Sequence, residues 1–154
     1  MSATKPVTWK SKTNWRTKLE RPKSPKLIPV PGRSAITGGY AFMLVPTPLE
    51  VDAQIRKLIP GEIITISKLR ERLAEEYHAD YACPLTVGVF LRTVGETAEE
   101  DARGGREDIT PYWRVVQDDM TLNPKLPGGI ARQARYLQQE GHLVRDNRVV
   151  YSPR

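Results

Sequence analysis

The sequence predicts an α+β domain that is mostly α: a winged helix-turn-helix with a small β-wing, preceded by a basic N-terminal extension. Three observations favour this fold. Four segments carry apolar residues at helical spacing, two of them are separated by a short turn, and two β-prone pieces flank Asp146-Asn147 near the C-terminal end. A chain of 154 residues suffices for one core but not for two large domains. We therefore expect a tail over residues 1–33 and one domain over residues 34–154.

The predicted tail is strongly basic. It contains nine Lys and Arg against the single acid Glu20, a net charge of +8, whereas the remaining 15 basic and 17 acidic residues leave the domain at −2. Its prolines and scarce apolar residues predict that it does not fold alone. One interpretation is that its cations lie along phosphates while Trp9 and Trp15 stack on bases. The other is that Trp9, Trp15 and Leu19 dock on the domain as an arm and the lysines stay solvated.

The domain begins with a turn, an apolar stretch and a helix. Gly38 and Gly39 indicate a turn before the apolar residues 40–45. The segment TPLEVDAQIRKLIP (47–60) has a threonine suited to the N-cap, a proline suited to the first helical position, and apolar residues at spacings of four and three. It predicts an amphipathic helix, which Pro60-Gly61 ends. Residues 62–65 then form a short apolar link or strand.

Two further helices indicate a helix-turn-helix. SKLRERLAEEY (67–77) places Leu69, Leu73 and Tyr77 on one face. The segment PLTVGVFLRTVGETAEEDA, from residue 84, has Leu85 and Val89 at helical spacing, although its valines would also suit a strand. The linking sequence HADYACP is short, so the second helix is expected to face a nucleic-acid groove.

The rest of the chain predicts a strand, a helix and a wing. After the loop RGGRED, Val115-Val116 suit a short strand, and QDDMTLNPKLPGG is dense in turn-forming residues. GIARQARYLQQEGH predicts a helix with Ile130, Ala134 and Leu137 on one face and Gly141 as its C-cap. LVRDNRVVYS at the end predicts a small hairpin, the wing.

Taken together, these segments resemble a known family. IITISKLRERLA, PLTVGVFL, PYWRVV and LPGGIARQARYLQQEGH, in that order, resemble the DNA-binding C-terminal domain of alkylguanine-DNA alkyltransferases and of alkyltransferase-like proteins. The resemblance covers residues 46–142 and implies a winged helix-turn-helix, double-stranded DNA as the partner and a role in DNA repair. The Trp-rich start and TPYWR are more similar still to bacterial alkyltransferase-like homologues of unassigned role.

The chain departs from the family at the alkyl acceptor. In alkyltransferases the cysteine of Pro-Cys-His-Arg accepts the alkyl group, because its thiolate is a strong nucleophile. Here Tyr112 stands at the cysteine position and Trp113 at the histidine position. A phenol with an ordinary pKa of about 10 is protonated at neutral pH, and no base follows it. We therefore expect no alkyl transfer at this position and no enzyme activity.

The resemblance also supplies candidate sites. Alkyltransferase-like proteins replace the cysteine as well, and the family implies that they bind alkylated bases without repairing them. By analogy, Tyr112 and Trp113 would wall a pocket that stacks a flipped base. The candidate base pocket comprises Pro111, Tyr112, Trp113, Arg114, Gly128, Gly129 and Glu140. The candidate nucleic-acid contacts are Lys68, Arg70, Arg72, Leu85, Thr86, Gly88 and Arg92.

Two departures concern base flipping. Leu85 stands where the family has an arginine that fills the gap left by the flipped nucleotide. Thr65-Ile66 aligns with the family's Thr-Tyr, whose tyrosine helps to rotate the target phosphate. An apolar side chain such as Leu85 is nevertheless able to part base steps.

The same residues also have simpler interpretations. Tyr112 and Trp113 would serve equally well as core packing. Glu140 would then accept a hydrogen bond from Trp113 Nε1 or from a backbone amide. Cys83 lies at a helix start, where the pKa of a thiol falls, but no histidine or acid is spaced to pair with it, so a structural role is favoured.

Three functions follow from these alternatives. The leading one is a non-catalytic DNA-binding module that senses alkylated or flipped bases. The second is a protein-interaction adaptor that uses the winged helix as a scaffold without lesion specificity. The third is an alkyltransferase acting through Cys83.

Composition limits the cofactors and the cellular location. His78, Cys83 and His142 do not form a metal signature, so we expect no metal and no cofactor. The chain has no long apolar run that would span a membrane and no secretory signal in its first thirty residues. With a single cysteine, we expect a cytoplasmic protein without a membrane partner.

Overall fold

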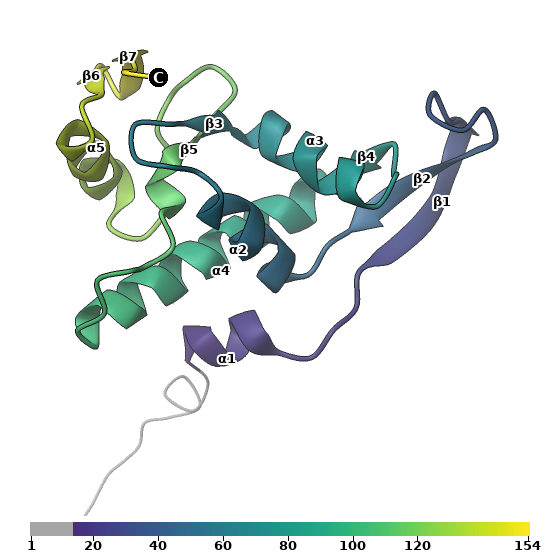
Figure 1. The fold of residues 1–154 in the computed structure, drawn as a ribbon, viewed down its shortest axis with the longest axis horizontal. Coiled ribbons are helices and arrows are strands. Elements are labelled where there is room, and N and C mark those ends of the chain that lie inside the picture. The colour runs from purple at the N-terminus through teal and green to yellow at the C-terminus, as the bar shows by residue number, and fades with distance from the viewer. Residues whose placement is uncertain (1–13) are drawn as a thin grey trace, which may run out of the picture.

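The computed structural model describes residues 14–154, so the prediction that Trp9 docks or stacks lies outside it. The described chain is a mixed α+β domain with a winged-helix-like arrangement, as the sequence predicts (Figure 1). Its helices are α1 (Trp15–Glu20), α2 (Pro48–Arg56), α3 (Ile66–Glu76), α4 (Pro84–Arg103) and α5 (Gly129–Gln139). Its strands are β1 (Lys26–Arg33), β2 (Tyr40–Val45), β3 (Ile64–Thr65), β4 (Tyr81–Ala82), β5 (Val115–Val116), β6 (Leu143–Arg145) and β7 (Arg148–Tyr151).

The long helix α4 is the centre of the core. Its buried stripe is Val87, Leu91, Val94 and Ala98, at the spacing of one helical face. The expected helix is therefore present, but Leu85 and Val89, which the sequence pattern placed on its packed face, are exposed at 77% and 54%. The true stripe starts two residues later. Leu85 and Val89 thus become surface residues that a partner is able to reach.

Helices α2 and α3 pack beside α4 as their apolar spacing predicts. Val51 and Ile55 of α2 and Leu69 and Leu73 of α3 have no exposed surface. Thr47 and Glu50 form a capping box at the start of α2, and Thr65 caps α3 by accepting a hydrogen bond from the amide of residue 68. The segment between α3 and α4 contains β4, so the helix-turn-helix has an extended turn.

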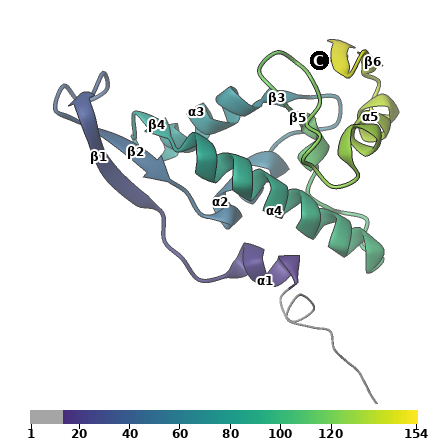
Figure 2. The same ribbon diagram turned by 180° about the vertical axis from the view of Figure 1, so that it is seen from behind.

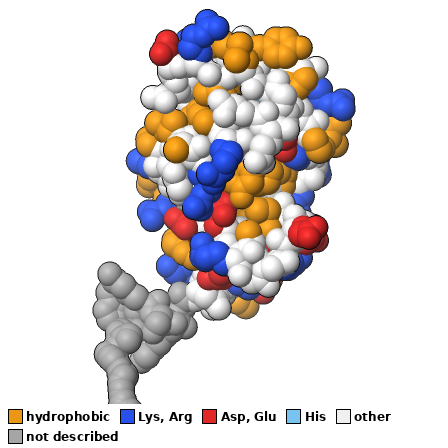
Figure 3. All heavy atoms as spheres, turned by 90° about the vertical axis from the view of Figure 1, so that its left-hand side faces the viewer, with side chains coloured by type: hydrophobic (Ala, Val, Ile, Leu, Met, Phe, Trp, Pro, Cys, Tyr) orange, Lys and Arg blue, Asp and Glu red, His pale blue; other side chains and the backbone are white. Residues whose placement is uncertain are grey.

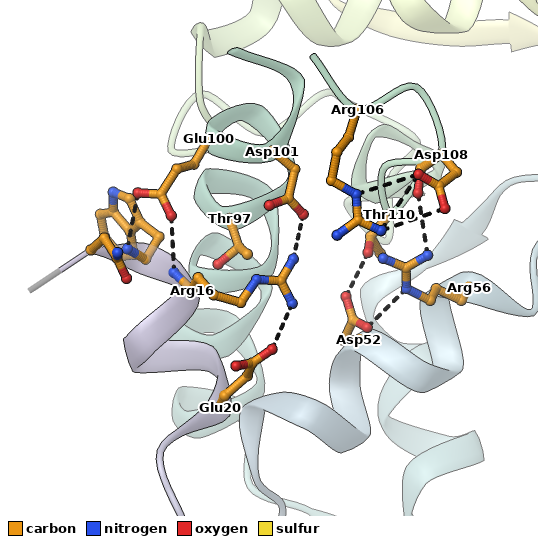
Figure 4. Close-up of polar contacts among 12 residues, drawn as sticks. Arg16, Glu20, Asp52, Arg56, Thr97, Glu100, Asp101, Arg106, Asp108 and Thr110 are labelled. Atoms are coloured by element: carbon orange, nitrogen blue, oxygen red, sulfur yellow. Dashed lines mark hydrogen bonds and ion pairs between the residues drawn. The ribbon is translucent and has the colours of Figure 1, made fainter. Parts of the chain in front are cut away.

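Helix α1 lies against α4, although its sequence belongs to the predicted tail. Leu19 is buried, and the backbone amides of Trp15 and Arg16 donate to the Glu100 carboxylate at 3.2 and 3.1 Å (Figure 4). The Arg16 guanidinium pairs with Asp101. The burial of Leu19 agrees with the second interpretation of the tail, in which this residue docks on the domain as part of an arm.

Strand β1, which the sequence analysis did not predict, pairs with β2 in an antiparallel hairpin that crosses the expected boundary at residues 33 and 34. β2 also pairs with β4 in parallel, so the sheet order is β1-β2-β4. Figures 1 and 2 both show the hairpin projecting beyond the helices. Pro29 and Pro31 obscured β1 because proline disfavours strands except at a sheet edge, where β1 lies.

Two small sheets complete the fold. β3 pairs in parallel with β5, and β6 pairs with β7 to form the wing. Asp146 and Asn147 have φ values of 53° and 61°, the left-handed backbone that a tight hairpin turn requires. None of the helices in the described part of the chain has the length and hydropathy needed to cross a membrane.

Candidate nucleic-acid interface

The PYWR segment forms a short 3-10 turn, Tyr112–Arg114, between α4 and β5. Tyr112 has no exposed surface, and Trp113 is only 8% exposed. The Trp113 and Tyr136 rings stack with centroids 4.0 Å apart, and the Tyr112 ring meets both edge-on. These arrangements are typical of aromatic packing in a core. In this conformation Tyr112 presents no surface to a base.

A buried carboxylate organises these aromatic rings. Glu99, 6% exposed, accepts hydrogen bonds from the hydroxyls of Tyr112 and Tyr136 at 2.6 and 2.9 Å, and Arg132 lies 3.4 Å from it. Burial and the bond to Glu99 raise the pKa of Tyr112 far above that of a free phenol. The Tyr112 hydroxyl therefore keeps its proton and donates it in the hydrogen bond to Glu99. No sequence motif pointed to Glu99, which is separated from Tyr112 by thirteen positions.

A second buried pair joins three parts of the chain. Arg114 Nε and Nη2 donate to Glu140 at 2.9 and 2.6 Å, while Arg114 Nη1 donates to the Leu58 carbonyl at 2.7 Å. Trp113 Nε1 donates to Glu140 at 3.1 Å, as the simpler interpretation of Glu140 expected. Burial opposes ionisation of Glu140, but the bonds from Arg114 and Trp113 outweigh it and lower the pKa of Glu140. This pair ties the 3-10 turn to the ends of α2 and α5.

The two glycines before α5 allow a sharp entry into that helix. Gly128 and Gly129 have φ values of 77° and 65°. A Cβ on Gly128 would lie 2.5–2.7 Å from the Arg132 side chain, which itself faces Glu99. The predicted base-pocket residues are thus neighbours in space, with Pro111 also buried. They pack on one another and line none of the hollows described below.

Of the four predicted nucleic-acid contacts on α4, all but Thr86 line a surface groove. Its volume is about 630 Å³, and Leu85, Gly88 and Arg92 line it. The other lining residues are Ile66, Pro84, Val89, Leu91, Gln117, Asn123, Pro124 and Lys125. The loop residues of this lining carry no sequence signal for the site, because only the fold brings residues 117–125 beside the start of α4.

The predicted contacts on α3 lie apart from this groove. Lys68 is exposed and pairs with Glu71 at 2.8 Å. Arg70 lines a hollow of about 450 Å³ that faces β4, and Arg72 lines another of about 440 Å³ beside α2. Arg70 and Arg72 thus line different hollows, and none of these three cations lines the groove that contains Arg92.

A hydrogen-bonded pair of side chains, Cys83 and Thr86, lies at the start of α4. Cys83 is its N-cap residue, and the Thr86 hydroxyl donates to Cys83 Sγ at 3.2 Å. Burial raises the pKa of the thiol, but hydrogen bonds from the Thr86 hydroxyl and from amides of the first turn outweigh this and lower it. Among residues 14–154, no group of three His, Cys, Asp or Glu is placed to hold a metal ion.

The wing and α5 lie together at one end of the molecule (Figure 1). Leu143, Val150 and Tyr151 of the wing are exposed at 48%, 45% and 59%. Figure 3 views this side of the molecule, on which hydrophobic, basic and acidic side chains are interspersed.

A search of protein-family models finds no match, and a search of curated proteins finds none either. Among solved structures, Atl1 of S. pombe in complex with damaged DNA containing O6-carboxymethylguanine is similar, with a TM-score of 0.43 and 17% identity. The similarity covers 64% of this chain and 78% of that one. A likeness of this degree does not assign a function.

Proposed function

We propose that the chain is a non-enzymatic protein that binds double-stranded DNA through the exposed N-terminal half of α4. The observation that carries this proposal is Gly88. It is exposed within the helix, and a Cβ added there would meet nothing within 4 Å. Glycine inside a helix costs about 1 kcal/mol relative to alanine, and no contact within the described chain requires it. Close approach of a ligand to the helix backbone is a reason for glycine at such a position.

The charges around the groove suit a phosphate backbone. Arg92 and Lys125 line the groove, and none of its lining residues is acidic. The N-terminal end of α4 adds the partial positive charge of the helix dipole, while the amides of its first turn bond to Cys83. These groups would fix the helix on the duplex, while Leu85 would reach the bases as an apolar wedge.

We further propose that an extrahelical alkylated base would enter the α4 groove and not the Tyr112 cluster. A volume of about 630 Å³ is within the range of small-molecule sites. Ile66 and Pro124 offer apolar surface, and Gln117 and Asn123 offer amides that hydrogen-bond a base edge. Entry beside Tyr112 would require the stacked pair of Trp113 and Tyr136 to separate.

The surroundings of Tyr112 and Cys83 support the proposal that the chain is not an enzyme. The Tyr112 hydroxyl, at the position of the family's acceptor cysteine, is buried and donates to Glu99. Cys83, the N-cap residue of α4, accepts a hydrogen bond from the Thr86 hydroxyl. In the described chain no histidine or carboxylate bonds to it. Cys83 therefore has no adjacent base to activate it, and Tyr112, although bonded to Glu99, is buried away from any substrate.

The test is fluorescence anisotropy on duplexes with one O6-methylguanine or none, over a series of salt concentrations. We expect log K to fall by about 0.9 per phosphate contact as log salt rises. Asn123→Ala should reduce the preference for the methylated duplex, whereas the exposed Gln138→Ala of α5 should not. Equal affinity for both duplexes would refute lesion sensing. An affinity that does not change with salt concentration would refute the proposal that the chain binds DNA through phosphate contacts.

A second function has one observation in its favour. Leu85 and Val89 are exposed large hydrophobic residues on one stretch of α4, and such patches also mark protein interfaces. In that case the chain would be an adaptor, its binding to duplexes would be weak and blind to lesions, and Leu85→Ala would leave DNA affinity unchanged.

A further inference from the structure

The β1–β2 hairpin and the segment leading into it carry only positive formal charge. No Asp or Glu occurs from residue 21 to residue 49, whereas Arg21, Lys23, Lys26 and Arg33 all do. These four cations are exposed, and in the described chain none of them pairs with a carboxylate. One acid from outside the hairpin, Asp80, lies beside it: its carboxylate accepts a hydrogen bond from the Phe42 amide at 2.9 Å and contacts Ser34 of the connecting turn.

The shape of the hairpin suits a duplex. It projects beyond the helices as a two-stranded ribbon (Figures 1 and 2). With a rise of about 3.3 Å per residue, Lys26 and Arg33 lie at most ~23 Å apart along β1. Duplex DNA carries one charge per ~1.7 Å of axis, so a ribbon of this length would pass along several base pairs.

The tip of the hairpin adds exposed apolar groups to the cations. Tyr40 is 81% exposed and lies opposite Arg33 in the strand register. Ile36, in the connecting turn, is 57% exposed. The core does not use these side chains. An aromatic ring beside an arginine is a common means of contacting nucleic acid, and strands enter grooves in several DNA-binding folds.

The open edge of the hairpin argues against another strand as its partner. β1 is one of the two edge strands of its sheet, and Pro29 and Pro31 remove two N–H donors from it. An edge with missing donors resists pairing with a further chain. The free charge of the hairpin is therefore better matched to an anionic ligand than to an added strand.

The base of the hairpin adjoins the start of α4. The amide of Cys83, the N-cap residue of α4, donates to the Leu44 carbonyl of β2 at 2.8 Å. We propose that the β1–β2 hairpin is a second DNA-binding element, a basic ribbon that contacts phosphates beyond the base pairs covered by α4. This inference rests on the proposed function of α4.

The experiment measures the salt dependence of binding to a duplex of about 24 base pairs for three proteins. These are the wild type, Lys26→Gln/Arg33→Gln, and a control with equal charge loss at the C-terminal end of α4 and the loop that follows it, Arg103→Gln/Arg106→Gln. We expect the slope of log K against log salt to become less negative by about 1.8 in the hairpin variant, about 0.9 for each lost phosphate contact. The control should keep the wild-type slope. Thermal unfolding of all three proteins verifies that these surface changes leave the fold intact.

The outcomes separate the two proposals. If the wild type binds and the hairpin variant has the slope of the wild type or changes no more than the control, the hairpin is not a DNA contact and the α4 proposal stands. If the wild type does not bind the duplex, both proposals fail. A loss confined to the hairpin variant supports the inference.

Discussion

Tyr112 is the residue at which core packing and base stacking predict different results, so its removal is informative. Its ring is fully buried, and its hydroxyl bonds to Glu99. Truncating a buried large aromatic side chain to alanine costs about 3–5 kcal/mol of unfolding free energy. Tyr112→Phe keeps the ring and removes one hydrogen bond to a charged group, for about 1.5–3 kcal/mol. Tyr136 and Arg132 remain with Glu99 in that variant.

Urea unfolding followed by circular dichroism gives these free energies, and fluorescence anisotropy gives the affinity for methylated and unmethylated duplexes. We expect Tyr112→Phe to lose stability while its ratio of affinities for the two duplexes stays at the wild-type value. The binding of Tyr112→Ala is compared only under conditions in which the unfolding measurement shows that this variant is folded. A loss under about 1 kcal/mol in Tyr112→Ala, together with a selective loss of binding to the methylated duplex, would refute the core assignment.

Two further predictions concern the buried charges near α5. Glu140→Gln should cost about 3–5 kcal/mol of unfolding free energy, because it leaves the Arg114 charge buried without its partner; the exposed Lys68→Gln should cost at most about 1 kcal/mol in the same urea titration, and equal losses would contradict the structure. His142 is 4% exposed with both ring nitrogens unpartnered in the described chain, and burial lowers its pKa. Because the unfolded state then binds the proton more tightly, the free energy of unfolding should have its full value above the unfolded pKa of about 6.5 and fall as the pH drops below it. His142→Leu should weaken this pH dependence. An unchanged pH dependence in His142→Leu would contradict the claim that burial of His142 causes it.

Most helices could be predicted because local signals were strong. The capping box of Thr47 and Glu50, the Leu69/Leu73 face and the turn at Asp146-Asn147 all act within a few residues. β1 was missed because its prolines disfavour a strand anywhere but at an edge, and edge position is a property of the sheet. The buried face of α4 was misplaced because valine and leucine occur on both sides of its first turns.

The candidate site was less accessible from the sequence. The resemblance brought together Tyr112, Arg114 and Glu140, which are neighbours, but burial decides whether neighbours form a pocket or a core. Glu99 and Lys125 carry no motif, and only the fold brings them to Tyr112 and to the α4 groove. Long-range contacts of this kind leave no periodic signal along the chain.

The most direct test of the central claim, that DNA approaches the backbone of α4, is the duplex affinity of Gly88→Leu beside its unfolding free energy. Leucine is a better helix former than glycine by about 0.5–1 kcal/mol, and the space around Gly88 is open. We therefore predict a variant at least as stable as the wild type that binds duplex DNA at least about tenfold more weakly, a change of about 1.4 kcal/mol. Undiminished affinity in a stable variant would contradict the claim.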